Sequence, residues 1–272
     1  GGQGQIGFGA IIACTILSGR AISPRAQWTQ LLTRVNQSLA SYKSLSQLMS
    51  QPREHAADAH FVARNHLQGS IEFRNVSFTY PGAAKPALNN VSFKIEAGER
   101  VAILGKIGSG KTTIAKLILG LYKPEEGAVL IDGVDVRQID PADLRRNVGA
   151  VLQDVWLMSG TLRENIALGA DLVNDDAMLR AAQIAGVEDF ASQHPHGYGM
   201  RVGERGEGLS GGQRQAVSIA RALVSNPPLW VFDEPSSAMD SAAEVQLVER
   251  LRGAVEGHTF VVITHKSTMV GL

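Results

Sequence analysis

The sequence predicts an α/β fold, and two features from residue 69 onward indicate it. Short apolar, β-branched runs are separated by helical stretches. The early runs alternate apolar and polar residues, as in an antiparallel sheet, whereas the later ones are almost wholly apolar, as in parallel strands covered on both faces. We therefore expect a parallel core sheet with an added antiparallel β-layer.

Seven runs carry this prediction. They read IEFRNVSF (71–78), VSFKI (91–95), RVAILG (100–105), AVLID (128–132), NVGAVLQ (147–153), PLWVFD (228–233) and TFVVIT (259–264).

Composition limits the kind of protein. The 272 residues are 44% hydrophobic and 19% charged, which is typical of a globular chain. Lys plus Arg equals Asp plus Glu at 26 each, so no overall basic field favours a nucleic acid as partner. The single cysteine, Cys14, excludes an internal disulfide and suits a reducing cytoplasm.

The N-terminal region has a different character. Residues 1–19 carry no charge and 6–17 are nearly all apolar, but a helix needs about 20 apolar residues to cross a bilayer. Two interpretations stay open at this point: a buried helix of a soluble protein, or the remaining part of a transmembrane helix. Residues 28–49 place apolar side chains at spacings of three and four, which predicts an amphipathic helix that packs on other helices.

Residues 51–68 lose this periodicity and gain charge, so we expect a linker there. The chain begins with Gly1 rather than Met and ends soon after the last predicted strand. We expect it to be a fragment of a longer polypeptide.

A phosphate-binding loop is predicted at residues 105–112. They read GKIGSGKT, match G-x-x-x-x-G-K-[ST], and lie between an apolar strand and a helical stretch. The glycines let backbone N–H groups surround phosphate oxygens, Lys111 reaches the terminal phosphates, and Thr112 holds Mg²⁺. A flexible glycine-rich turn is the alternative. The candidate nucleotide-binding residues here are Gly105, Lys106, Ile107, Gly108, Ser109, Gly110, Lys111, Thr112 and Thr113.

Two carboxylates follow a second apolar strand, in LWVFDE. Asp233 at the strand end is placed to bind Mg²⁺ through water. Glu234 next to it points to the other side, where it could activate an attacking water molecule.

Between these sites lies LSGGQ (209–213), followed by the helical RQAVSIARAL. Ser210, Gly211 and Gly212 at a helix N-terminus can bind an anion. With this pentapeptide the sequence resembles the ABC (ATP-binding cassette) ATPases. In that family the pentapeptide, which here ends at Gln213, closes over ATP that is bound to a second subunit. The resemblance implies a head-to-tail dimer of two copies with ATP and Mg²⁺ as cofactors.

The resemblance implies further roles. Tyr80 in FTYP resembles the aromatic that stacks on adenine, and Gln153 in VLQD the glutamine that touches Mg²⁺ and the attacking water. His265 in VITHK resembles the switch histidine at the γ-phosphate, and Asp240 in SSAMD the aspartate at the dimer interface. Glu204 in VGERG resembles the exporter residue that couples the cassette to the membrane domain. The catalytic set is then Glu234, His265, Lys111 and Gln153, with Thr112, Gln153 and Asp233 at the metal.

The implied fold is a P-loop NTPase: an ABC nucleotide-binding domain with a RecA-like core, an antiparallel β subdomain and a helical subdomain. A long helix from a transmembrane domain precedes it. The implied domains are 1–50, the end of an exporter's transmembrane domain with its last helix and cytoplasmic extension; 51–68, a linker; and 69–272, the C-terminally truncated ATPase domain.

The segment IIACTILSGRAISPRAQWTQLLTR, followed by SLSQLMSQPRE, resembles the permease/ATPases of type I secretion, which export RTX-type proteins and adhesins. This implies an ATP hydrolase coupled to transport in the bacterial inner membrane, with its ATPase domain on the cytoplasmic side. Its partners would be a periplasmic adaptor, an outer-membrane channel and a secreted protein. An exporter of peptides, lipids or drugs and a non-transport ABC ATPase are the alternatives.

Overall fold

The computed structural model describes residues 7–51, 54, 61–106, 108–168, 170 and 174–271, and the description below concerns these. The chain forms two compact units, Gly1–Ala57 and Asp58–Leu272, each described by itself. Ile107, one of the predicted nucleotide-binding residues, lies outside the described residues.

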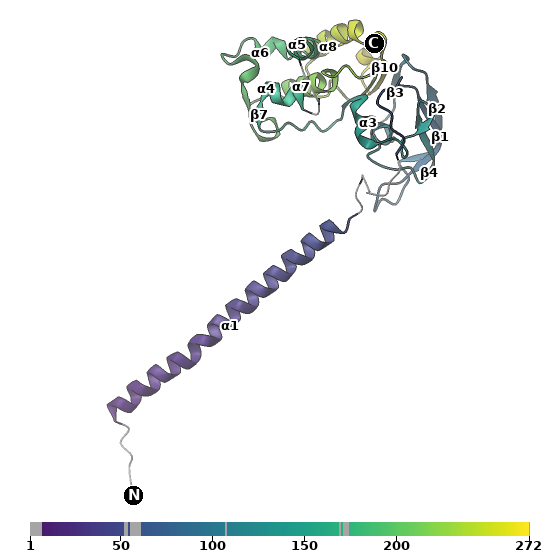
Figure 1. The fold of residues 1–272 in the computed structure, drawn as a ribbon. Coiled ribbons are helices and arrows are strands. Elements are labelled where there is room, and N and C mark those ends of the chain that lie inside the picture. Colours follow the sequence, from purple (N-terminus) through teal and green to yellow (C-terminus); the bar gives the residue numbers. More distant parts are fainter. Residues whose placement is uncertain are drawn as a thin grey trace. The chain divides into compact units, whose positions relative to one another are not determined.

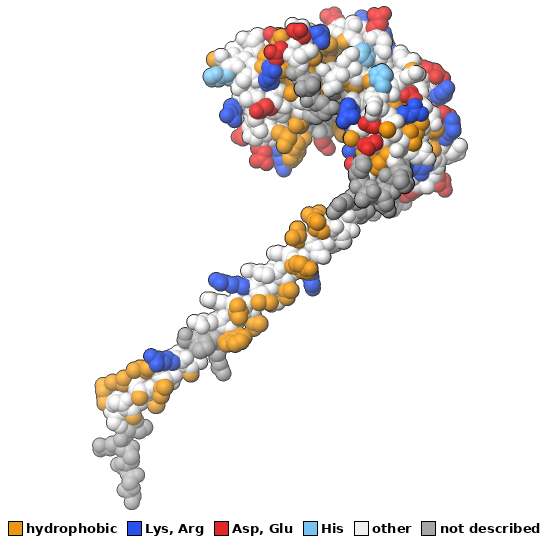
Figure 2. All heavy atoms as spheres, viewed as in Figure 1, with side chains coloured by type: hydrophobic (Ala, Val, Ile, Leu, Met, Phe, Trp, Pro, Cys, Tyr) orange, Lys and Arg blue, Asp and Glu red, His pale blue; other side chains and the backbone are white. Residues whose placement is uncertain are grey.

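The first unit contains a single long helix, α1 (Phe8–Met49), of 42 residues (Figure 1). The sequence predicted helical structure both for the apolar segment and for 28–49, and in the structure the two form one continuous helix. Hydrophobic side chains are exposed along its length, including Phe8, Trp28 and Tyr42 (Figure 2). Over the whole helix they do not gather on one face, although the sequence predicted such a face for 28–49 alone. Within the described residues, no helix has an 18-residue stretch apolar enough to cross a membrane.

The second unit begins its regular structure with an antiparallel sheet in the order β2-β1-β4-β5. Its strands are β1 (Ile71–Phe78), β2 (Leu88–Ile95), β4 (Glu126–Ile131) and β5 (Val134–Asp135). Phe73 of β1 lies opposite Phe93 of β2, with ring centroids 4.5 Å apart. This sheet is the added β-layer that the alternating runs predicted.

A parallel sheet in the order β3-β10-β9-β6 forms the centre of the unit. Its strands are β3 (Arg100–Leu104), β6 (Val148–Val151), β9 (Leu229–Asp233) and β10 (Thr259–Thr264). Val231 belongs to one hydrophobic core, whereas its neighbours Trp230 and Phe232 belong to the other. Because both faces are covered, the sequences of β9 and β10 show no polar alternation.

Among the described residues of this unit, seven α-helices accompany these two sheets. They are α2 (Lys111–Ile118), α3 (Pro141–Arg146), α4 (Leu162–Ala167), α5 (Asp175–Ala185), α6 (Glu188–Ala191), α7 (Gly211–Leu223) and α8 (Ser241–Ala254). The short strands β7 (Gly160–Thr161) and β8 (Arg201–Val202) pair beside them, and 3₁₀ turns span Gly197–Gly199, Glu204–Gly206 and Ser267–Gly271.

Each face of the parallel sheet has its own core. One core joins α2 and the antiparallel sheet, and the other joins α4, α5, α7 and α8. Leu67, just before β1, is 1% exposed and its N–H donates to Asn147 Oδ1 at 3.2 Å, so the chain is already attached to the second unit there. The predicted α/β fold, with its parallel core, antiparallel β subdomain and helical subdomain, is confirmed.

Candidate nucleotide-binding site

The predicted site residues follow the ends of neighbouring strands. In the parallel sheet Leu104 pairs with Thr264, Ile263 with Asp233, and Val151 with Phe232. The carboxyl ends of β3, β10, β9 and β6 therefore meet at one edge of the sheet. This edge collects the start of the phosphate loop, His265, Glu234 and Gln153, from segments far apart in the sequence. Such edges are where open α/β sheets bind ligands.

The phosphate loop connects β3 to α2. Gly110, the N-cap of α2, has φ +86°, and a Cβ there would lie 2.2 Å from the Ala87 carbonyl oxygen, so the position requires glycine. Lys111 Nζ donates to the carbonyl oxygens of Gly105 and Lys106 at 2.8 Å each. The ammonium group thus lies inside the curve of its own loop. It could exchange these carbonyls for phosphate oxygens without leaving the site.

Tyr80 lies beside the first turn of α2. Its hydroxyl is 3.1 Å from Thr113 Oγ1, and its ring meets that of Tyr122 edge to face, with centroids 5.2 Å apart. Lys116 Nζ lies 5.4 Å from the centroid of the Tyr80 ring. These contacts hold the ring next to the phosphate loop, at a position that suits a stacked base.

Asp233 ends β9 as a fully buried residue. Within the described part of the chain, neither of its carboxylate oxygens has a partner at hydrogen-bonding geometry. Burial raises the pKa of Asp233, and the Glu234 charge adds to this, while the nearby Thr112 hydroxyl and the Lys111 charge oppose it. A buried carboxylate without a donor is unfavourable unless a cation compensates it, so the site fits a metal ion held by Asp233 and Thr112.

Glu234 has a left-handed backbone, with φ +51°, which is rare for a residue other than glycine. Its N–H donates to the Ile263 carbonyl oxygen at 2.8 Å, and its own carbonyl oxygen accepts from Gln215 Nε2 at 3.2 Å. Its carboxylate Oε1 lies 2.8 Å from His265 Nδ1. The turn aims the Glu234 side chain toward the end of β10, and backbone strain of this kind is found at functional sites.

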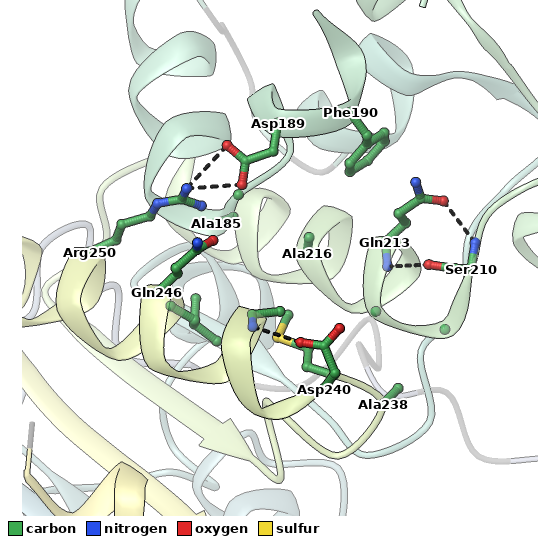
Figure 3. A pocket seen from close by; sticks show the side chains of 16 residues that line it. Ala185, Asp189, Phe190, Ser210, Gln213, Ala216, Ala238, Asp240, Gln246 and Arg250 are labelled. Atoms are coloured by element: carbon green, nitrogen blue, oxygen red, sulfur yellow. Dashed lines mark hydrogen bonds and ion pairs between the residues drawn. The ribbon is translucent and has the colours of Figure 1, made fainter. Parts of the chain in front are cut away.

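The LSGGQ segment caps α7 in a reciprocal way. The Gln213 N–H donates to Ser210 Oγ at 3.2 Å, and the Ser210 N–H donates to Gln213 Oε1 at 2.8 Å (Figure 3). A Cβ on Gly212 would lie 3.3 Å from the Ala238 carbonyl oxygen, so the glycines allow a close approach to the turn before α8. The cap leaves the start of the helix open to an anion.

A pocket of about 380 Å³ adjoins this segment. It is lined by Ser210, Gly211, Gly212 and Gln213 together with residues of α5, α6 and α8, including Asp240 (Figure 3). Asp240 is the N-cap of α8 and accepts from the Ala243 N–H at 2.8 Å. The predicted interface aspartate therefore also stabilises a helix start, beside the LSGGQ segment.

Two other predicted residues lie on the surface. Gln153 is exposed two residues after β6, and Glu204 is exposed in the 3₁₀ turn Glu204–Gly206. Trp156, three residues after Gln153, has its ring centroid 4.7 Å from the guanidinium carbon of Arg205, the residue that follows Glu204.

Sequence reasoning missed several residues that hold these groups in place. Gln215 joins α7 to the Glu234 carbonyl, and Lys266 Nζ contacts Glu244 and the Ser236 carbonyl oxygen. Arg250 of α8 pairs with Asp189 at 2.9 Å at the mouth of the pocket. No local pattern in the sequence indicates these contacts, because each joins residues that lie far apart in the chain.

Comparison with known proteins identifies the protein family. A family model described as ABC transporter matches residues 88–237, more than half of the chain. The chain therefore belongs to the ABC transporter family, as its motifs predicted.

Particular relatives narrow the comparison. The "Leukotoxin translocation ATP-binding protein LktB" of Mannheimia glucosida is 40% identical over 268 residues, which are 98% of this chain and 38% of that protein. Proteins of the same name from Mannheimia haemolytica and Bibersteinia trehalosi are also 40% identical. A solved structure, "Structure of a bacterial Atm1-family ABC exporter with ATP bound", is 35% identical, with a TM-score of 0.78 over 96% of this chain and 46% of that one. The chain thus spans less than half the length of these relatives.

Proposed function

We propose that this chain is the ATP-binding and ATP-hydrolysing part of an ABC exporter. The observation that carries the proposal is the convergence of the phosphate loop, Asp233, Glu234 and His265 at the carboxyl edge of one parallel sheet. This arrangement suits phosphoryl transfer to water. It combines a phosphate-binding loop, the buried carboxylate of Asp233, and a second carboxylate, Glu234, that is paired with His265.

In this proposal each residue has a separate task. The loop N–H groups and Lys111 bind the phosphates, Tyr80 stacks on the base, and Thr112, Asp233 and Gln153 hold Mg²⁺, either directly or through water. When bound, the metal neutralises charge on the phosphate oxygens. Lys111, Thr112 and Asp233 lie close enough to influence one another electrostatically, which supports a shared phosphate-metal centre.

Glu234 and His265 act on the attacking water. Glu234 accepts the proton of the water, and His265, 2.8 Å away, orients the Glu234 carboxylate and reaches the γ-phosphate. Because a positioned base contributes about 10²- to 10⁴-fold to a rate, loss of the Glu234 carboxylate lowers turnover by about 10²-fold or more while the phosphate loop still binds nucleotide.

Hydrolysis needs two copies of the chain. The capped LSGGQ segment of one copy, with its pocket and Asp240, closes over ATP on the phosphate loop of the other. The open helix start at Ser210 supplies the backbone N–H groups for the γ-phosphate.

The whole protein is an exporter whose membrane domain includes α1. The exposed apolar side chains of α1 require other helices around them, and Glu204 contacts that membrane domain. We infer type I protein secretion in a bacterial inner membrane, with the ATPase domain on the cytoplasmic side, a periplasmic adaptor and an outer-membrane channel. The LktB proteins, named for leukotoxin translocation, support this substrate class. Export of a peptide, lipid or drug is the second candidate, because the likeness to an Atm1-family ABC exporter supports export without naming a cargo.

The experiment compares proteins released by the native host when the complete gene carries Glu234→Gln or Glu249→Gln. Glu249 is an exposed residue of α8 and serves as the matched control. Loss of one or a few large proteins with Glu234→Gln alone supports protein secretion. An unchanged set, with ATPase activity abolished in the purified variant, excludes protein cargo and favours the second candidate.

A further inference from the structure

Trp156 joins the surface around Gln153 to the LSGGQ helix, a connection that the proposed site does not use. Its side chain is 56% exposed, three residues after Gln153. Arg205, five residues before Ser210, places its guanidinium over the ring at 4.7 Å from the centroid. Arg221 of α7 donates from Nη1 to the Trp156 carbonyl oxygen at 3.0 Å. Arg205, before LSGGQ, therefore contacts the Trp156 ring, and Arg221, after LSGGQ, binds the main chain of the same residue.

Arg221 also fixes the chain that follows the tryptophan. Its Nε donates to the Asn165 carbonyl oxygen at 2.8 Å and its Nη2 to Asn165 Oδ1 at 3.1 Å. The Asn165 side chain in turn bonds the N–H and the carbonyl oxygen of Met158 at 2.9 Å each. Burial lowers the pKa of Arg221, but an arginine still stays charged at neutral pH. Segment 156–158 is therefore attached to α7.

Arg205 completes the connection from the other side. It has φ +57°, a strained conformation that the neighbouring packing must maintain. A Cβ on Gly206 would lie 3.2 Å from Leu157 Cδ1 and 2.5 Å from Arg214 Cδ, so this turn packs against both the 156–158 segment and α7. A bulkier residue at 206 has no room.

We propose that Trp156 is a positioning residue that keeps Gln153 and Ser210 in register through Arg205 and Arg221. Gln153 acts at the nucleotide of its own copy, whereas Ser210 acts at the nucleotide of the facing copy. This inference rests on the proposed function, because it assumes that the two motifs serve ATP hydrolysis in a dimer.

The test measures ATPase kinetics and nucleotide affinity of the complete polypeptide in lipid nanodiscs. Trp156→Leu and Arg205→Gln should each lower kcat by about three- to tenfold, since a cation over an exposed or partly exposed ring contributes modestly. The nucleotide Kd stays within about twofold, because the phosphate loop is untouched. Trp156→Phe and Arg205→Lys retain a ring and a cation, and should recover most of the rate.

The double variant Trp156→Leu/Arg205→Gln should have a kcat no lower than that of either single variant, because the two substitutions remove the same contact. Arg180→Gln, an exposed arginine of α5, is the charge-matched control and should leave kcat unchanged. An unaltered kcat in Trp156→Leu, or additive losses in the double variant, would overturn the inference. So would equal losses of kcat, affinity and melting temperature that Trp156→Phe does not recover. If instead the unaltered protein shows no ATPase activity that Glu234→Gln abolishes, the proposed function itself has failed.

Discussion

At the residue scale, the site combines groups whose environments are unfavourable without a ligand. Asp233 is buried without a hydrogen-bond donor among the described residues, and Glu234 holds a left-handed backbone. Lys111 lies on the carbonyl oxygens of its own loop. The burial of the Asp233 carboxylate and the backbone strain at Glu234 each decrease the stability of the folded chain, so function and stability oppose one another at these two residues.

Asp233→Asn should therefore stabilise the ligand-free protein while it removes Mg²⁺-dependent nucleotide binding. The pKa of Asp233 is raised from its ordinary value of 3.8, mainly by burial. A raised carboxyl pKa favours folding below the ordinary value, and this contribution is lost as the pH rises through the folded-state pKa. At neutral pH the variant should melt higher, by roughly 2–4 °C for each kcal/mol gained.

Calorimetry at pH 7 and pH 4 checks this prediction. The stabilising effect should shrink at pH 4, where the native carboxyl is partly protonated in the folded chain. A variant that melts lower than the unaltered protein at pH 7 would show that Asp233 has a partner in solution.

At the element scale, the start of α7 links helix stability to the site. Ser210→Ala removes the side-chain half of the cap and should reduce stability by about 1 kcal/mol. It should also reduce turnover, because in the proposed dimer the same oxygen would face the phosphate of the second copy. Ser210→Thr keeps the capping oxygen and should retain both properties.

Asn174→Ala is the matched control, since Asn174 caps α5 by accepting from the Ala177 N–H at 2.7 Å, outside the pocket lining. Urea unfolding and steady-state ATPase rates on both variants separate the two effects. Equal turnover losses in the two variants would mean that Ser210 matters only as a helix cap.

At the whole-molecule scale, the two cores meet at the parallel sheet and fix where its strand ends lie. Trp230, Phe232 and Phe260 form an aromatic cluster on one face, with the Phe232 and Phe260 rings edge to face at 5.3 Å. Phe232 is fully buried next to Asp233. The aromatic residues of β9 therefore serve to hold the carboxylates at the sheet edge.

Phe232→Ala should cost about 3–5 kcal/mol of unfolding free energy, through lost burial and the cavity left behind. Val245→Ala, on the exposed side of α8, should change stability by no more than about 0.5 kcal/mol. Urea unfolding of both variants measures this. A loss below 1 kcal/mol for Phe232→Ala would show that the cluster is loosely packed.

The sequence allowed prediction of the strands and motifs, because apolar runs and glycine spacing are local signals. It also placed Asp233 at the end of a strand, whereas the strand pairing that brings Asp233 and His265 to one edge with the phosphate loop is seen only in the structure. The two-residue strands β7 and β8 carry too few residues for any pattern. The pair Glu234–His265 and the contacts of Trp156 with Arg205 and Arg221 join residues 31 to 65 positions apart, and only the folded chain reveals them.

The most direct measurement is the ATPase rate and ATP affinity of the complete polypeptide with Glu234→Gln, beside Glu249→Gln as control. Removing the Glu234 carboxylate leaves the phosphate loop and Asp233 intact. The account predicts that turnover falls by about 10²-fold or more while ATP affinity is retained. Undiminished turnover in Glu234→Gln would contradict the account, because hydrolysis would then proceed without the carboxylate that His265 orients.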